Sequence, residues 1–140
     1  MLSPMRTGAG VIPLALTTGR VLLGERASPC SDPDTWAGFG GSPEPADATL
    51  VDTALRELFE ETGYAGPIRL VDRATVVQGG TRAHVFVGLV PEEFEPELNW
   101  EHHTALWLDP MTLNPAALHW TVRGFRALTA PRWGRRRRGA

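Results

Sequence analysis

The stretch Arg56-Glu57-Leu58-Phe59-Glu60-Glu61-Thr62-Gly63-Tyr64 decides the fold, together with the glycine pair Gly40-Gly41 upstream. Because each helical residue turns the chain by about 100°, Glu57, Glu60 and Glu61 would share one face of a helix. Apolar side chains fall on a neighbouring face. The stretch therefore predicts a helix with an apolar side for the core and an acidic side for chemistry.

Three carboxylates within one helical turn repel one another, at a cost of roughly 0.2–0.5 kcal/mol per pair in water. A divalent cation would offset this cost, since Mg²⁺ prefers oxygen ligands and binds through carboxylates, waters and substrate phosphate. Arg56 stands four residues before Glu60 and can hold its carboxylate. A solvated acidic face is the alternative. The helix stop at Gly63 favours the cation, because it crowds the acids into the last turns, where the helix dipole disfavours them.

The pattern from Gly41 to Tyr64 resembles the signature of the Nudix hydrolases, G-x5-E-x7-R-E-U-x-E-E-x-G-U, where U is a bulky apolar residue. Its second half matches at every specified position. In its first half the acid position falls on Asp47 when counted from Gly41, and on Ala48 when counted back from Arg56. Either the loop carries one extra residue or that outer acidic contact is weakened or lost. The resemblance covers at least residues 9–108.

The resemblance implies an α/β (α+β) fold, an α/β/α sandwich with a mixed β-sheet between helices. It also implies a Nudix-type pyrophosphohydrolase that uses Mg²⁺, with Mn²⁺ as the alternative ion, to cleave a diphosphate linkage in a nucleoside diphosphate derivative. The metal ligands would be the Gly40 carbonyl and the carboxylates of Glu57, Glu60 and Glu61. Arg56 belongs to the same catalytic group.

An acid outside the helix is expected to reach this site. The pair Glu101-His102 comes six residues before an apolar strand that contains Trp107, as in many family members acting on triphosphates. Glu101 is thus a candidate metal ligand or general base, and Glu60 is the other candidate base. His102 and His103 also suggest zinc, but no cysteine or further histidine stands at a spacing that would complete such a site.

The wording Trp36-x-Gly38-Phe39-Gly40-Gly41 is similar to that of hydrolases acting on oxidised purine triphosphates. Trp36, Phe39 and Gly41 are therefore candidate substrate-binding residues, with core packing as the alternative for the two aromatic rings. We expect a nucleoside triphosphate, oxidised ones included, to give nucleoside monophosphate and pyrophosphate. The alternatives are an ADP-ribose or sugar-nucleotide pyrophosphatase, a non-catalytic nucleotide-binding regulator of this fold, and an enzyme acting on RNA.

Length and composition set the remaining expectations. The chain has 140 residues, and we expect residues 1–130 to form one Nudix domain. Residues 131–140 form a basic tail that should be disordered, since its arginines show no periodicity. The single Cys30 agrees with a reducing compartment, and no apolar run approaches the roughly 18 residues of a membrane span. We therefore expect a cytoplasmic protein with a nucleotide substrate and neither membrane nor nucleic acid as partner; a homodimer is left open.

Local signals predict the other elements. Residues 10–26 read as a hairpin turning at Thr17-Thr18-Gly19, with Pro13 marking a bulge or an edge position. Thr49 or Asp47 should cap the acidic helix, which ends at Thr62. Residues 68–78 and 81–90 form two strands joined by Gly79-Gly80. Residues 116–128 show helical spacing and predict a closing helix, in which His119 and Trp120 either border the site or pack.

Overall fold

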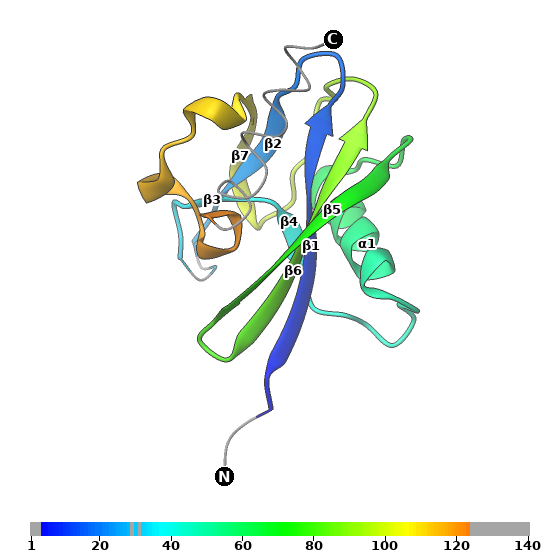
Figure 1. The fold of residues 1–140 in the computed structure, drawn as a ribbon, viewed down its shortest axis with the longest axis vertical. Helices are drawn as coiled ribbons and strands as arrows, with labels where there is room; N and C mark the ends of the chain where they lie inside the picture. The colour runs from blue at the N-terminus through cyan, green and yellow to red at the C-terminus, as the bar shows by residue number, and fades with distance from the viewer. Residues whose placement is uncertain (1–3, 29, 31, 124–140) are drawn as a thin grey trace.

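The computed structural model describes residues 4–28, 30 and 32–123 of the chain. Within these residues the centre is a seven-stranded mixed sheet with the order β3-β2-β1-β6-β5, in which β4 also pairs with β1 and β7 with β2 (Figure 1). The elements are β1 (Arg6–Ala15), β2 (Val21–Arg26), β3 (Trp36–Ala37), β4 (Phe39–Gly41), α1 (Leu50–Thr62), β5 (Arg69–Gln78), β6 (Thr81–Val90), β7 (His102–Leu108) and the 3-10 turns η1 (Pro110–Thr112) and η2 (Pro115–Ala117). The expected α+β fold with a mixed sheet is confirmed.

Strand β1 organises the sheet. It runs parallel to β6 along its whole length, from Arg6 opposite Thr81 to Ala15 opposite Val90. On its other edge it pairs antiparallel with β4 and then with β2, and Pro13 lies between these two stretches. The expectation of a bulge or an edge strand at Pro13 is wrong. Proline is accommodated here because it has no N–H to donate and falls where that edge of β1 changes partner.

The two faces of the sheet carry separate apolar clusters. Successive strand residues point to opposite faces, so Val11 packs in the cluster under α1 whereas Ile12 packs in the cluster on the other face. That second cluster is covered by Leu113, Leu118 and Val122 from the segment after β7. Figure 1 shows α1 on one side of the sheet and this segment on the other.

The segment after β7 differs from the expected closing helix. Residues 110–117 form the turns η1 and η2, each of which starts at a proline behind an Asp109 or Asn114 side-chain cap. Helical conformation begins only at Trp120 and reaches Arg123. The rest of the expected helix, and the tail of residues 131–140, lie outside the described residues. Among the helices that are described, none is long and apolar enough to cross a membrane.

The predicted ends of the acidic helix are confirmed. Of the two candidate caps, Thr49 is the N-cap: its hydroxyl accepts from Asp52 N at 3.2 Å, and Asp52 Oδ2 accepts from Thr49 N at 3.0 Å. Gly63 ends the helix in the left-handed region at φ 76°, and its N–H donates to Phe59 O at 2.8 Å. The last turn therefore closes directly behind Glu61.

The predicted hairpins are also confirmed. β1 and β2 turn through Gly19, and β5 and β6 turn through Gly79-Gly80, where all three glycines have positive φ. The observed bounds of β5 and β6 differ from the expected ones by a single residue at the start of β5. Strand alternation and the glycine turns were thus sufficient to define these local elements.

Gly63→Ala should lower the free energy of unfolding by about 1–2 kcal/mol, because a Cβ atom disfavours the left-handed conformation at this residue. Urea denaturation measures the change. Gly63→Asn is the matched control and should lose less, since asparagine tolerates this region better than alanine. An alanine variant as stable as the wild type would show that the left-handed stop does not matter for α1.

Candidate active site

Three acidic side chains meet at the end of α1. Glu57, Glu61 and Glu101 each offer a carboxylate oxygen, and these oxygens lie within 4.8 Å of one another. Glu57 and Glu61 stand one turn apart on α1, and Glu101 comes from the turn that precedes β7. We call these three residues the acid cluster. The structure thus brings the acid expected from outside the helix to two of the three helix acids.

Glu61 is the most constrained member of the acid cluster. Its side chain is 1 % exposed, and its Oε2 has no hydrogen-bond partner among the described residues. Burial, and then the neighbouring carboxyl groups of Glu57 and Glu101, raise the pKa of Glu61 to about 11. Burial and Glu57 also raise the pKa of Glu101. Both shifts favour the neutral forms of Glu61 and Glu101, and a bound cation would oppose them.

The glycine pair allows β4 to pass close to the acid cluster. A Cβ atom on Gly41 would lie 2.5 Å from Glu57 Oε1, and one on Gly40 would lie 2.6 Å from Ala9 O of β1. Side chains at these two positions would therefore displace either the strand or the acids.

Arg56 is held by an aspartate from the loop before α1. Its Nε donates to Asp47 Oδ1 at 3.1 Å, and its Nη2 donates to Asp47 Oδ2 at 2.9 Å and to Ser42 O at 3.0 Å. Asp47 also accepts from Thr53 Oγ1 and from the N–H of Glu44. The hydrogen bond from Arg56, followed by that from Glu44, holds the pKa of Asp47 far below its usual range. Asp47, whose place in the motif was left open, is thus a partner of Arg56.

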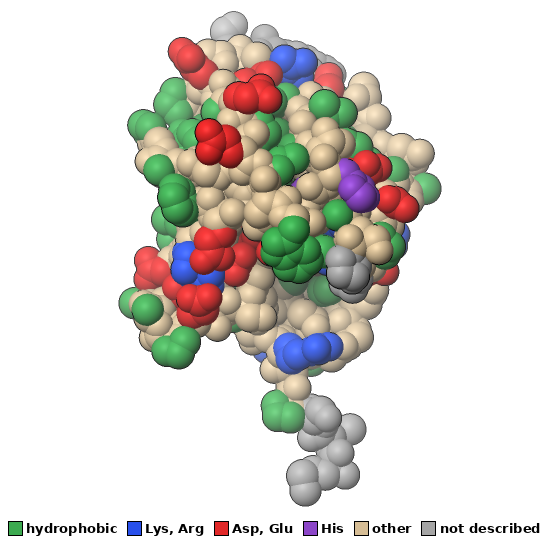
Figure 2. Space-filling model, turned by 180° about the vertical axis from the view of Figure 1, so that it is seen from behind, with side chains coloured by type: hydrophobic (Ala, Val, Ile, Leu, Met, Phe, Trp, Pro, Cys, Tyr) green, Lys and Arg blue, Asp and Glu red, His purple; other side chains and the backbone are tan. Residues whose placement is uncertain are grey.

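Arg56 in turn contacts two helix acids. Its Nη1 donates to Glu57 Oε1 at 3.0 Å and to Glu60 Oε1 at 3.1 Å. The expected contact with Glu60 is confirmed, but Glu60 is 46 % exposed at its side chain and is not part of the acid cluster. Figure 2 shows these acidic side chains gathered around a basic one on the face that carries α1.

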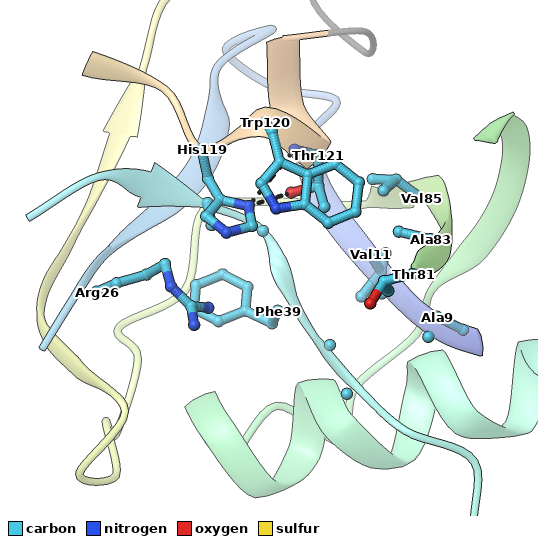
Figure 3. Close-up of a pocket in the computed structure, with 16 residues that line it drawn as sticks. Ala9, Val11, Arg26, Phe39, Thr81, Ala83, Val85, His119, Trp120 and Thr121 are labelled. Atoms are coloured by element: carbon cyan, nitrogen blue, oxygen red, sulfur yellow. Dashed lines mark hydrogen bonds between the residues drawn. The ribbon is translucent and has the colours of Figure 1, made fainter. Parts of the chain in front are cut away.

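A cavity of about 160 Å³ lies across β4 from the acid cluster. We call β4, which carries Gly40 and Gly41, the glycine strand. The rings of His119 and Trp120 form one wall, with their centroids 5.5 Å apart, and Thr121 Oγ1 lies 2.8 Å from His119 Nδ1 (Figure 3). The opposite wall is formed by β1, which includes Gly8 and Gly10, and by the small side chains of Ala83 and Val85 from β6. Because Gly41 lines the cavity and its backbone also lies against the carboxylate of Glu57, the cavity and the acid cluster share this strand.

Arg26 brings positive charge to this cavity. It is one of the lining residues, and Figure 3 shows its side chain beside Phe39. Its charge acts on Glu101 and on His119. Burial first, and then Arg26, lower the pKa of His119 to about 4, so this wall is neutral at pH 7. Sequence analysis missed Arg26, because an arginine at the end of a strand carries no signal of its own.

The three candidate substrate-binding residues take different places. Gly41 lines the cavity between the sheet and Trp120. Phe39 also lines it, but its side chain is fully buried in the apolar cluster under α1. Trp36 lines a second cavity with Leu118 and is not among the residues of the first. The aromatic wall of the first cavity is therefore built from the C-terminal segment instead.

The two histidines that suggested zinc lie apart. His102 is buried, with Nδ1 3.8 Å from Glu61 Oε1, whereas the half-exposed His103 has Nε2 3.6 Å from Asp34 Oδ1. Burial and Arg26 lower the pKa of His102 to about 4. In the described part of the chain, the group of potential metal-ligating side chains contains no histidine. The geometry thus agrees with the choice of an oxygen-ligated cation over zinc.

The arrangement of helix, glycine strand and acids has a known counterpart. A family model, the NUDIX domain, matches residues 4–128. The chain belongs to the NUDIX family. It is therefore a Nudix-type pyrophosphohydrolase, of a family that acts on nucleoside diphosphate derivatives and generally uses divalent metals.

Solved structures of other Nudix proteins are similar to this Nudix hydrolase. The dihydroneopterin triphosphate pyrophosphohydrolase of E. coli is 22% identical with a TM-score of 0.73, over 93% of this chain and 99% of that one. The MutT protein from Methanosarcina mazei Go1 is 19% identical with a TM-score of 0.73, over 97% of each chain. A C. elegans Ap4A hydrolase in a binary complex is 16% identical with a TM-score of 0.72, over 95% of this chain and 99% of that one. No curated protein matches the sequence. At these identities the likeness shows the fold alone.

Asp47→Asn should lower the free energy of unfolding at pH 7, because it removes the charge that holds Arg56. Pairing lowers the pKa of Asp47 in the folded state, so its contribution is complete above the usual value of 3.8 and is lost as the pH falls through and below it. The gap in unfolding free energy between wild type and variant should therefore shrink between about pH 5 and pH 2. Chemical denaturation at several pH values measures the gap.

Glu95→Gln, which removes an exposed loop carboxylate, is the control and should show no such gap. If the gap for Asp47→Asn stayed constant down to the lowest pH, the charged pair with Arg56 would not be its source.

Proposed function

We propose that the protein hydrolyses nucleoside triphosphates, oxidised ones included, to nucleoside monophosphate and pyrophosphate with the help of Mg²⁺. The supporting observation is that the acid cluster and the aromatic-walled cavity meet at the strand of Gly40 and Gly41. A triphosphate substrate needs a cation site for its phosphates and a slot for its base within the same short span.

The acid cluster fits a hard divalent cation. Its donors are carboxylate oxygens, and the buried Glu61 Oε2 lacks a partner among the described residues. Mg²⁺ takes such oxygens readily, and Mn²⁺ accepts the same donors. Glu57, Glu61 and Glu101 would hold the ion, with the carbonyl of Gly40 as the further ligand. When bound, the ion supplies charge neutralisation at the diphosphate and a lower pKa for an attacking water.

The chain's own residues would then position the reacting groups. Arg56, fixed by Asp47, donates to Glu57 and keeps its carboxylate turned toward the glycine strand. Glu101 is the better candidate to take the proton of the attacking water, because it belongs to the acid cluster and its pKa is raised by burial. Glu60 is the alternative base, although it is exposed and bound to Arg56.

The cavity would take the base of the nucleotide. Stacking on the rings of Trp120 and His119 suits any base, since every base has a flat π-face. Arg26 lies on the wall of the same cavity and its charge acts on Glu101, so a phosphate between base and metal would lie in its positive field. The small residues opposite leave room for a planar ring.

The choice of substrate rests on this site more than on the neighbours. Of the three similar structures, one is named a dihydroneopterin triphosphate pyrophosphohydrolase, one a MutT protein and one an Ap4A hydrolase. ADP-ribose or a sugar nucleotide remains the alternative substrate class. A non-catalytic regulator loses its main support, because Asp47 still anchors Arg56 despite its displaced position in the motif. A cytoplasmic location remains an expectation from the sequence.

Glu61→Gln should lower the Mg²⁺-dependent release of pyrophosphate by at least about 100-fold, because it removes a charged ligand from the acid cluster. Glu57→Gln and Glu101→Gln should behave in the same way. Their melting temperatures without metal should not fall, since the amide avoids crowding three carboxylates. The measurement is pyrophosphate release from a panel of nucleotides with and without Mg²⁺.

Two controls make this test specific. Glu92→Gln removes an exposed carboxylate beyond β6 and should keep full activity. Glu60→Gln separates the two candidate bases: a loss as large as that of Glu101→Gln would assign catalysis to Glu60 as well. Near-complete activity in Glu61→Gln would contradict the metal site, and binding of nucleotides without any hydrolysis would favour a regulator.

Trp120→Ala should raise KM for a purine nucleoside triphosphate by about 5- to 150-fold, the range expected for loss of one base-stacking contact. The value of kcat should change little, since Trp120 is not part of the acid cluster. Trp120→Phe should retain most of the affinity. Steady-state kinetics measure both constants, and Trp100→Ala, at an exposed tryptophan that does not line the cavity, is the control. An unchanged KM in Trp120→Ala would place the base elsewhere.

A further inference from the structure

His102 is a buried polar side chain that the proposed chemistry leaves without a role. Its side chain is 1 % exposed, and neither ring nitrogen has a hydrogen-bond partner among the described residues. Burying a polar group without a partner costs stability, so such groups are rare unless they serve another purpose. A leucine would fill the same interior space without that cost.

The fold holds the ring of His102 in a fixed place. Phe39 packs against it edge to face, with centroids 5.1 Å apart and planes at 61°. On the β2 side, a Cβ atom at Gly24 would lie 2.5 Å from His102 Cδ2, so the absence of a side chain there makes the space for the imidazole. Phe39 of β4 and Gly24 of β2 therefore provide a slot that fits this ring.

The slot opens toward the acid cluster. Nδ1 of His102 lies 3.8 Å from Glu61 Oε1, while Glu61 Oε2 also lacks a hydrogen-bond partner in the described part of the chain. The distance is too long for a hydrogen bond, and a movement of about 1 Å would close it. A carboxylate that binds a cation through one oxygen needs a donor at the other oxygen to fix its orientation.

We propose that His102 is a positioning residue, whose Nδ1–H holds Glu61 Oε1 so that Oε2 is presented to the divalent cation. This inference rests on the proposed function, since it assigns Glu61 to the metal. It gives a role to both unpartnered groups at once: the imidazole gains an acceptor, and the carboxylate gains a donor away from the cation.

The test is the affinity for Mn²⁺ alone, measured on the substrate-free full-length protein by calorimetry or electron paramagnetic resonance. His102→Leu should weaken Mn²⁺ binding by about 10- to 100-fold, the usual effect of losing a residue that orients a metal ligand. His102→Asn, whose amide N–H can stand close to the position of Nδ1, should stay near the wild-type affinity. The melting temperature of His102→Leu in chelator should be equal to or above that of the wild type.

Further variants separate the explanations. His103→Leu, at the exposed neighbouring histidine, should leave Mn²⁺ affinity unchanged. Wild-type affinity in His102→Leu, or an equal loss in His102→Leu and His102→Asn, would overturn the role of His102. If Glu61→Gln bound Mn²⁺ as well as the wild type does, the proposed metal site itself would fail. Loss of Mn²⁺ in Glu61→Gln with full binding in His102→Leu would remove only the inference about His102.

A second measurement needs no variant and so does not depend on how His102→Leu folds. Mg²⁺ replaces Mn²⁺ in this experiment because it is diamagnetic. A ¹⁵N–¹H correlation spectrum of the imidazoles in the Mg²⁺ complex reports which nitrogen of His102 carries the proton. The proposal requires the Nδ1–H form. An Nε2–H form would contradict it, because Nδ1 would then have no proton to donate to Glu61.

Discussion

Three carboxyl groups are held within 4.8 Å of one another, and burial raises the pKa of two of them, Glu61 and Glu101. Glu61 is buried, Glu57 lies against the backbone of Gly41, and Glu101 approaches from the turn before β7. Electrostatic repulsion would separate such side chains if they were free to move. Much of the surrounding structure can be understood as the framework that keeps them in place.

Three sets of contacts make up that framework: the ends of α1, the pair of Asp47 and Arg56, and the pairing of β7 with β2. The cap at Thr49 and the left-handed stop at Gly63 fix the length of α1, so that Glu57 and Glu61 occupy its last turns. The pair of Asp47 and Arg56 ties the helix to its preceding loop and directs an N–H to Glu57. Pairing of β7 with β2 then brings the turn containing Glu101 to the same place. Together these contacts fix the positions of the carboxylate oxygens in the acid cluster.

Strand β1 explains why a cavity lies so near this group. It carries β4 on one edge and β6 on the other, so the glycine strand and the small residues of β6 end up on either side of it. Its side chains point alternately to the two faces and pack in two apolar clusters, one under α1 and one under the C-terminal segment. The acid cluster lies on the helix side, and the ring of Trp120 lies on the other. The proposed phosphate and base sites therefore lie close together, on opposite faces of the sheet beside the same strand, β1.

Sequence patterns predicted what depends on local chemistry. The period of the acids, the cap at Thr49 and the glycine turns each have a signature within a few residues, and the resemblance to the Nudix family pointed to Glu101. Patterns failed where partners are distant. Nothing near Arg26 marks it as a wall of the cavity, and the choice between Trp36 and Trp120 depends on how the segment after β7 folds back. The turns η1 and η2, which each start at a proline, occupy the beginning of the expected helix. Their positions also depend on a distant partner, because this segment packs on the sheet.

Diffraction from crystals of the wild-type protein soaked with Mn²⁺ and a slowly hydrolysed nucleoside triphosphate analogue tests the central claim most directly. Anomalous scattering should locate the ion at about 2.0–2.3 Å from oxygens of Glu57, Glu61 and Glu101, with phosphate oxygens completing its ligands. An ion bound only at Glu60, or an acid cluster that holds no ion while the analogue is bound elsewhere, would contradict the account.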